Sequence, residues 1–251
     1  VEHLLSQMGN SVRKVTTEEI RTYLADYQKN SNCSNVTIDN IRRNISSFFS
    51  WLEEEDYILK SPMRRIHKIK TKTVVKNTIS DESIEKLRDH CTEIRDLAII
   101  DLLYSTGIRV GELVNLNIDD IDLEGRECIV YGKGDKERRV YFDAKAKVHL
   151  KEYIEGRKDE NKALFVTLDA PYDRLKISGV EIRLRQLGRK LDLEKIHPHK
   201  FRRTMATRAI DKGMPIEQVQ KILGHSQIDT TMQYAMVNQN NVKTSHQKYM
   251  S

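Results

Sequence analysis

The chain has 251 residues, 38% of them hydrophobic, so it can bury one large core or two modest ones. Its 43 Lys and Arg residues against 37 Asp and Glu residues give a net charge of +6, a mild excess that favours a polyanionic partner without establishing one. Three widely spaced cysteines argue against a zinc site or disulfide framework, and the lack of a signal peptide or a long apolar run argues against secretion or a membrane span, so we expect a cytoplasmic protein.

Residues 1 to about 60 have the pattern of a helical region. Thr16 and Glu19 form a capping box ahead of an apolar stripe at helical spacing, and a second stripe follows the polar segment 30–35. We expect Arg42 and Arg43, on other faces, to meet either solvent or a DNA groove. The residues expected to form the core are Ile20, Tyr23, Leu24, Tyr27, Ile38, Ile41, Ile45, Phe48, Trp51 and Leu52.

The composition changes over residues 60–80, which hold seven Lys or Arg residues, no acid and no helical period. We interpret this run as an extended, basic linker. A flexible tail would have a similar composition, but its place between two folded segments favours a linker that crosses a phosphate backbone, where bound cations release counterions. Residues 1–77 carry thirteen basic against nine acidic residues, and the remainder thirty against twenty-eight. The expected division is a helical domain at 1–66, a linker at 67–79 and a larger domain at 80–251.

The larger domain is expected to begin with helices. Ser80 caps the first of them, and acidic residues in its first turn suit the helix dipole. A second helix is expected at about 94–105, ending at Gly107 in the left-handed capping position, and a short helix begins within 108–113.

The apolar period then changes to two. Short strands are expected near 121–123, 128–131 and 138–142, which together make a small antiparallel meander. Helices resume at 144–155 and 178–190. The predicted fold class is therefore mainly α with a small antiparallel β-sheet.

Three short helices are expected near the C-terminus. Pro198 starts the first and Pro215 the second, which Gly224 caps. Ser226 or Asp229 caps the third, which carries Tyr234.

The stretch 197–234, together with Arg109 and the hairpin lysine Lys133, combines residue types that suit attack on a phosphodiester. Arginine binds phosphate through a planar fork that stays protonated, so two arginines can clamp the non-bridging oxygens without a metal. A lysine at a β-turn can reach the leaving oxygen as a general acid, and histidines titrate near neutrality. A tyrosine becomes a nucleophile when such neighbours assist it.

Residues 106–113 read Thr-Gly-Ile-Arg-Val-Gly-Glu-Leu, and residues 132–138 contain the run Gly-Lys-Gly followed by Lys-Glu-Arg. These motifs resemble those of the tyrosine recombinase (phage-type integrase) family, and the resemblance covers nearly the whole chain. The family's T-G-x-R-x-x-E-L motif places its first catalytic arginine at Arg109. Glu112 in this motif is interpreted as a partner that orients an arginine. The hairpin motif GKG-x-KER appears at residues 132–138, with the family's catalytic lysine at Lys133.

The remaining motifs lie in the C-terminal stretch. The H-x-x-R box matches His199 and Arg202, although a family His often stands where this chain has Arg203. The L-G-H box places the last histidine at His225, and the nucleophile position falls on Tyr234. A single GKG turn or H-x-x-R box has little specificity. The ordered set of six is specific.

The resemblance implies a helical core-binding domain, a mixed α/β catalytic domain, and strand exchange through a 3′-phosphotyrosine without metal, nucleotide or other cofactor. Arg109 and Arg202 would bind phosphate oxygens, Lys133 would protonate the leaving 5′ oxygen, His199 would be a general acid/base, and His225 would brace the phosphate. It also implies a homotetramer on duplex DNA recombination sites, with an accessory DNA-bending or excision factor as a further partner.

Each of these residues alone has an ordinary structural alternative. Arg109 suits a helix start, His225 a packed position behind a helix end, Lys133 a solvated turn, and Tyr234 an amphipathic core. Tyr249 is a rival nucleophile that lies outside the motif spacing. The side chains expected to contact DNA are Arg42, Arg43, Arg64, Arg65, Lys68, Lys70 and Lys72.

Other functions remain open at this point. A type IB topoisomerase would use the same attack without a paired site, and a non-catalytic DNA-binding protein would keep the fold without the chemistry. Within the recombinases, we favour a mobile-element integrase over a host Xer-type enzyme that resolves chromosome dimers. The Val1 start suits an integrase from which an N-terminal arm-binding domain has been removed.

Overall fold

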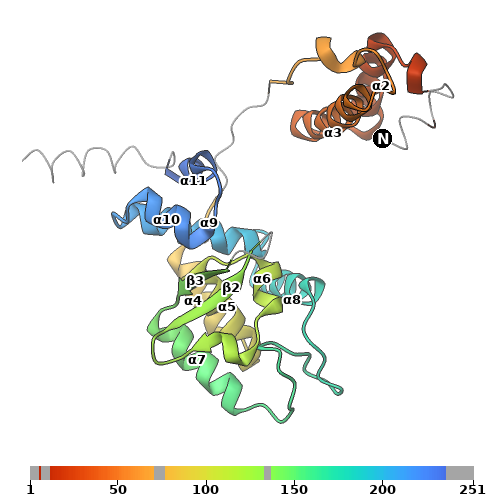
Figure 1. The fold of residues 1–251 in the computed structure, drawn as a ribbon. Helices are drawn as coiled ribbons and strands as arrows, with labels where there is room; N and C mark the ends of the chain where they lie inside the picture. Colours follow the sequence, from red (N-terminus) through yellow and green to blue (C-terminus); the bar gives the residue numbers. More distant parts are fainter. Residues whose placement is uncertain (1–5, 7–11, 71–76, 133–136, 236–251) are drawn as a thin grey trace, which may run out of the picture. The chain divides into compact units, whose positions relative to one another are not determined.

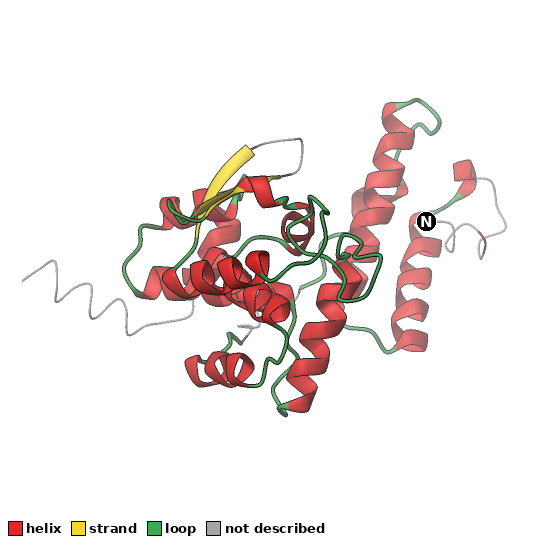
Figure 2. Ribbon diagram, turned by 90° about the horizontal axis from the view of Figure 1, so that it is seen from below, coloured by secondary structure: helices red, strands yellow, loops and turns green. Residues whose placement is uncertain are grey.

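The computed structural model describes residues 6, 12–70, 77–132 and 137–235, drawn in colour in Figure 1. The chain divides into two compact units, residues 1–74 and 75–251, which are described separately. Helices dominate both, and the strands form one narrow sheet (Figure 2). Within these described ranges, no helix is both long and apolar enough to cross a membrane.

The first unit is built on two helices, α2 (Thr17–Ser31) and α3 (Asn35–Glu54), flanked by the short 3-10 helices η1 (Val12–Lys14) and η2 (Pro62–Arg65). The predicted capping box is confirmed: the Thr16 side chain accepts a hydrogen bond from the Glu19 backbone amide, and Glu19 accepts one from the Thr16 amide. The buried side chains of the unit's core are Val15, Ile20, Tyr23, Leu24, Ile38, Ile45, Phe49, Leu52 and Met63.

One part of the predicted core is wrong. Trp51 is 48% exposed, whereas its neighbour Phe49, which the predicted stripe omitted, is fully buried. Phe49 and Ile45 are four residues apart, so they share the inner face of α3. Trp51 lies on the flank, with its ring 5.6 Å from that of Tyr57.

The basic run also differs from the expected extended linker, because its first half packs onto the helical unit. Residues 62–65 form η2, Met63 is buried, and Ile66 and Ile69 pack against the core at a spacing of three residues. The Ile69 amide donates a 3.1 Å hydrogen bond to Oδ1 of the buried Asp39. Residues 61–70 therefore belong to the fold of the first unit.

The second unit has nine helices and three strands in the ranges that the structure describes. Its elements are α4 (Asp81–Asp89), α5 (Ile94–Thr106), α6 (Val110–Asn115), η3 (Ile118–Asp120), β1 (Ile121–Asp122), β2 (Glu127–Tyr131), β3 (Glu137–Tyr141), α7 (Ala144–Glu155), α8 (Ile177–Lys190), α9 (Pro198–Asp211), α10 (Ile216–Leu223) and α11 (Ile228–Ala235). The strands pair antiparallel in the order β1-β2-β3, with Cys128 opposite Val140 and Val130 opposite Arg138. The predicted fold class, mainly α with a small antiparallel sheet, is confirmed.

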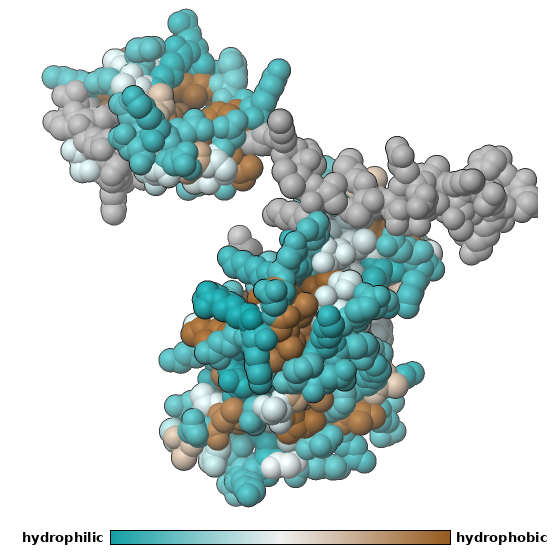
Figure 3. Space-filling model, turned by 180° about the vertical axis from the view of Figure 1, so that it is seen from behind, coloured by the Kyte–Doolittle hydropathy of each residue, from teal (hydrophilic) through white to brown (hydrophobic). Residues whose placement is uncertain are grey.

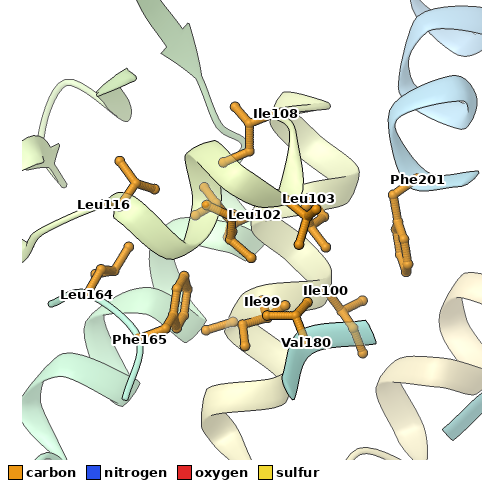
Figure 4. Close-up of a cluster of buried hydrophobic side chains, with 14 of the residues drawn as sticks. Ile99, Ile100, Leu102, Leu103, Ile108, Leu116, Leu164, Phe165, Val180 and Phe201 are labelled. Carbon is orange, nitrogen blue, oxygen red and sulfur yellow. The ribbon is translucent and has the colours of Figure 1, made fainter. Parts of the chain in front are cut away.

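Helix α5 is the centre of this unit's core. It is buried nearly all round and packs chiefly against α7 and α9, as expected of a helix whose apolar residues are not confined to one face. Figure 4 shows Ile99, Ile100, Leu102 and Leu103 of α5 within a cluster that also includes side chains such as Phe165. The outer surface is mainly hydrophilic in the view of Figure 3, with smaller hydrophobic patches.

A second, much smaller cluster holds the last three helices together. Its buried members are Met205, Ala206, Val219 and Leu223, and Tyr234 packs against it. The predicted glycine cap Gly107 lies beside it in the left-handed region, at φ 64°. The backbone turn requires glycine there, whereas a Cβ at this position, 2.4 Å from the Met205 Cε, would displace only the end of a flexible side chain.

Candidate active site

Three arginines, of which Arg109 and Arg202 are predicted site residues, converge on the C-terminal end of α10. The carbonyl oxygens of Ile222, Leu223 and Gly224 each accept a hydrogen bond from a different arginine, with N···O distances of 2.9, 2.6 and 3.2 Å from Arg138, Arg202 and Arg109. The last carbonyls of a helix lack partners within the helix and carry partial negative charge, so cations stabilise them. The arginines come from β3, α9 and the turn before α6, which this helix end brings together.

Arg202 is the most buried of the three arginines, with 4% of its surface exposed. Its Nη1 donates to the Gly107 carbonyl at 2.7 Å and its Nη2 to the Leu223 carbonyl, so backbone fixes both ends of the fork. No carboxylate of the described residues forms an ion pair with it. Burial and the positive charge of Arg109 lower the pKa of Arg202 to about 10. A buried cation held only by neutral dipoles suits an incoming anion.

Arg109 is held by Glu112, one turn along α6. Glu112 accepts hydrogen bonds from the Arg109 backbone amide at 2.7 Å and from its Nη1 at 2.9 Å. The Arg109 side chain is 40% exposed, so it combines a fixed position with access to solvent. Burial raises the pKa of Glu112, but hydrogen bonds from Arg138 and Arg109 outweigh it and hold the pKa below its ordinary value. Glu112 is therefore a carboxylate that orients arginines, as the motif predicts.

His225 follows Gly224 and is partly buried. Its Nδ1 lies 2.8 Å from Oγ1 of Thr231, a fully buried residue of α11. Burial and the charges of Arg202 and Arg109 lower the pKa of His225 to about 4. The imidazole is therefore neutral at physiological pH, which suits a proton acceptor or an uncharged hydrogen-bond partner.

Tyr234 lies beside His225 on the other side of the loop between α10 and α11. The two rings are 6.2 Å apart with planes 26° from parallel. The phenol also lies close enough to Arg202 to influence that group's charge state. Helix α11 begins at Ile228 with Asp229 in its first turn, so it starts slightly earlier than a cap at Asp229 predicts.

The remaining predicted residues are less tightly assembled. His199 is exposed in the first turn of α9, 6.5 Å ring to ring from His197. Burial and Arg203 lower the pKa of His197. Lys133 and Lys72 lie outside the described residues.

Arg138 is a site residue that the sequence motifs did not single out, although it stands in the quoted GKG-x-KER run. The alternation of β3 could have revealed it, because Glu137, Arg139 and Tyr141 are exposed while Arg138 and Val140 turn inward. An inward-facing arginine on a short strand needs a buried partner, and that partner is Glu112.

Across residues 6, 12–70, 77–132 and 137–235, no group of three or more His, Cys, Asp or Glu side chains is arranged to hold a metal ion. The positive charges that meet at the end of α10 belong to the side chains of Arg109, Arg138 and Arg202.

Acidification from pH 7 to pH 5 is expected to destabilise the second unit through His225. Its pKa is about 4 in the folded chain against an ordinary value of 6.5, so the unfolded chain binds a proton first as the pH falls. The contribution of His225 to the free energy of unfolding is at its full value above the unfolded pKa of this residue and falls progressively as the pH drops from that value to the folded pKa. His225→Gln should therefore show a smaller fall in urea midpoint between pH 7 and pH 5 than the wild type. His90→Gln, at an exposed position, is the control, and an equal fall in the wild type and His225→Gln would contradict the assignment.

Comparison with known proteins extends over nearly the whole chain. Residues 66–241 match the phage integrase family, and residues 1–59 match the SAM-like N-terminal domain of phage integrases. The tyrosine recombinase XerC of Oceanobacillus iheyensis is 30% identical over 98% of this chain and 85% of its own length. A XerA recombinase crystal structure is 26% identical with a TM-score of 0.63, covering 100% of this chain and 89% of that one. The Tn1549 transposon integrase with transposon right end DNA is 20% identical with a TM-score of 0.81, covering 100% and 92%.

Proposed function

Because the chain belongs to the phage integrase family and is a tyrosine-type site-specific DNA recombinase, we propose that Tyr234 is its nucleophile and duplex DNA its substrate. The observation that supports this assignment best is the arrangement at the end of α10. There, two arginines with backbone-anchored guanidinium groups lie near a tyrosine that stacks on a neutral histidine.

The chemistry follows from these positions. The Tyr234 oxygen attacks the scissile phosphorus, a phosphotyrosine bond forms at the 3′ end, and the bond to the 5′ oxygen breaks. Arg202 and Arg109 neutralise the charge that develops on the non-bridging oxygens. The phenolic proton passes to a neutral histidine, for which we propose His225 because its ring stacks on that of Tyr234, and Lys133 supplies a proton to the leaving oxygen. Attack of a second strand's 5′ hydroxyl on the phosphotyrosine then rejoins the DNA.

His199 is proposed as a second acid/base or phosphate contact. It precedes Arg202 by three residues on α9, so the two side chains lie on neighbouring faces of one helix, and its exposure leaves it accessible to DNA.

Covalent trapping tests the proposal. The protein is incubated with duplexes that carry one nick within a randomised core, and adducts that resist SDS are isolated and their DNA sequenced. Recovery of a common sequence, with the DNA attached to the peptide that contains Tyr234, is the expected result. Relaxation of plasmids that lack that sequence would favour a topoisomerase, and binding without any adduct would favour a non-catalytic DNA-binding protein.

Two biological roles have support among the similar proteins. The likeness to the Tn1549 integrase fits our first proposal, a mobile-element integrase, and the 30% identity to a XerC protein fits the alternative, resolution of chromosome dimers. Recombination on a circular-element junction favours the first, and recombination between two chromosomal copies of one site favours the second. A homotetramer on two sites, with an accessory DNA-bending or excision factor, belongs to either role.

The DNA-contacting surface of the first unit is proposed to be the outer side of residues 64–70. Arg64, Arg65, Lys68 and Lys70 are exposed there, while the apolar residues between them face the core. Arg43 is 62% exposed and joins this proposal. Arg42 does not, because its side chain is 12% exposed and donates a 2.8 Å hydrogen bond to Asp39 within the fold.

Neutralising the two lysines of this surface should flatten the salt dependence of DNA binding. With Lys68→Gln and Lys70→Gln together, the slope of log affinity against log salt should fall in magnitude by roughly 1 for each lysine. Fluorescence anisotropy on a duplex from about 50 to about 300 mM salt, roughly a sixfold range, measures this slope. The matched control replaces Lys14 and Lys29, exposed elsewhere on the first unit, and a slope equal to this control would remove residues 68–70 from the interface.

A further inference from the structure

We propose that Arg138 is a positioning residue of the cleavage reaction, one that fixes the first phosphate-binding arginine and the helix end beside His225 through a single guanidinium group. The inference rests on the proposed function, because it concerns how the same site is held for attack. No motif assigns this role.

Arg138 acts as a clamp between Glu112 and the end of α10. The first half of this clamp is a two-point ion pair with Glu112. Nη1 and Nη2 of Arg138 each donate to one carboxylate oxygen, both at 2.7 Å. The side chains of Arg138 and Glu112 are 13% and 5% exposed, so water screens the pair little. The same two oxygens accept the hydrogen bonds from Arg109. Glu112 thus relays the position of Arg138 to the catalytic arginine, and its single charge is shared between two cations.

The second half of the clamp is the bond to α10. Nε of Arg138 donates to the Ile222 carbonyl at 2.9 Å, three residues before His225. The contact is close, because a Cβ added to Gly224 would stand 3.1 Å from Arg138 Cδ and Nε. Gly224 also has a φ of 62°, so glycine there satisfies both the turn and the approach of the arginine. The backbone that leads into His225 is therefore seated on the Arg138 side chain.

Arg138 differs from Arg109 in what remains available to a substrate. All three of its guanidinium nitrogens already have protein partners, and the side chain is largely buried. Arg109, in contrast, is 40% exposed. Because the Arg138 guanidinium group is engaged by protein groups, replacing Arg138 should lower the rate of attack and leave the affinity for intact DNA almost unchanged.

A lysine cannot reproduce this arrangement. An ammonium group would keep the charge beside Glu112, but it lacks the planar fork that meets both carboxylate oxygens while a third nitrogen reaches Ile222. Arg138→Lys therefore separates the geometry of the clamp from its charge, and Arg138→Met removes both. Arg139→Met is the matched control, because Arg139 is the next residue of β3, points outward and pairs at the surface with Glu127.

The experiment measures single-turnover cleavage of a nicked site and dissociation constants for the intact duplex. We expect Arg138→Met to slow cleavage about 10²-fold and Arg138→Lys about tenfold, since misplacement by about 1 Å is enough for losses of this size. DNA affinity should stay within about threefold of the wild type, and Arg139→Met should match the wild type within about twofold. Glu112→Gln combined with Arg138→Met should cost little more than Arg138→Met alone, because the two residues act as one unit.

The outcomes separate this inference from the function on which it rests. If the wild type forms no adduct, the proposed function fails. If the wild type forms the adduct while Arg138→Met cleaves like Arg139→Met, the positioning role is wrong. A loss of DNA affinity as large as the loss of rate would also overturn it, because Arg138 would then be a DNA contact. Should Arg138→Met melt early, Arg138→Lys, which retains the charge, decides by the same comparison.

Discussion

Tyr234→Phe is expected to abolish the covalent protein–DNA adduct while DNA binding and folding stay unchanged. Phenylalanine keeps the ring that stacks on His225 and packs against the small cluster of the last three helices. Only the hydroxyl is lost, and with it the atom that attacks phosphorus. Because removal of a nucleophile leaves at most the weak reaction with water, cleavage should fall by at least about 10⁴-fold.

The measurement is the yield of SDS-resistant adduct on a nicked site over time, with anisotropy and thermal melting on the same samples. Tyr249→Phe serves as the control for the rival nucleophile, and it should form the adduct at the wild-type rate. An adduct in Tyr234→Phe, or its loss in Tyr249→Phe alone, would move the nucleophile away from α11.

Arg202→Lys should slow cleavage by about 10²–10³-fold, the usual cost of losing one fixed donor to a developing anion. The guanidinium of Arg202 reaches the Gly107 and Leu223 carbonyls with its two terminal nitrogens, and an ammonium group cannot hold both and keep the same orientation toward a phosphate. Binding of intact DNA should change far less, because phosphate contacts elsewhere on the protein dominate affinity.

Single-turnover kinetics at saturating protein separate the chemical step from binding. Arg208→Lys is a suitable control on the same helix, since Arg208 pairs with Asp81 and lies over the Tyr104 ring. Its cleavage rate should match the wild type within about twofold. Equal rates for Arg202→Lys and Arg208→Lys would show that the buried fork has no part in phosphate stabilisation.

Much of the fold could be predicted from local patterns. Glycine at 107 and proline at 198 mark helix boundaries that the structure keeps, because backbone conformation at these positions depends mainly on the residue itself. The period-two alternation of apolar residues likewise predicts the strands. The position of Trp51 cannot be predicted in this way, because α3 carries Phe48, Phe49 and Trp51 close together, and only packing decides which of them face inward.

The sequence motifs predict which residues form the candidate site, but they do not predict how those residues are arranged in space. Spacing relates His199 to Arg202 within one helix, but the approach of Arg109 to Arg202 depends on where α10 ends. The role proposed for Arg138 likewise depends on a carbonyl of a distant helix. Such contacts join segments far apart in the chain, so no local pattern encodes them.

The three arginine-bound carbonyls at the end of α10 make the assembly of the site depend on the docking of α10 and α11. Helices α10 and α11 are attached through a small cluster of buried residues and the three arginine hydrogen bonds, so we expect them to open at a lower free energy than the main core around α5. Opening would separate the three arginines from the α10 carbonyls to which they are bonded, and it would move Tyr234 and His225 away from the arginines. A chain in which these helices have opened should therefore be unable to cleave DNA, because the nucleophile and the arginines would no longer be assembled.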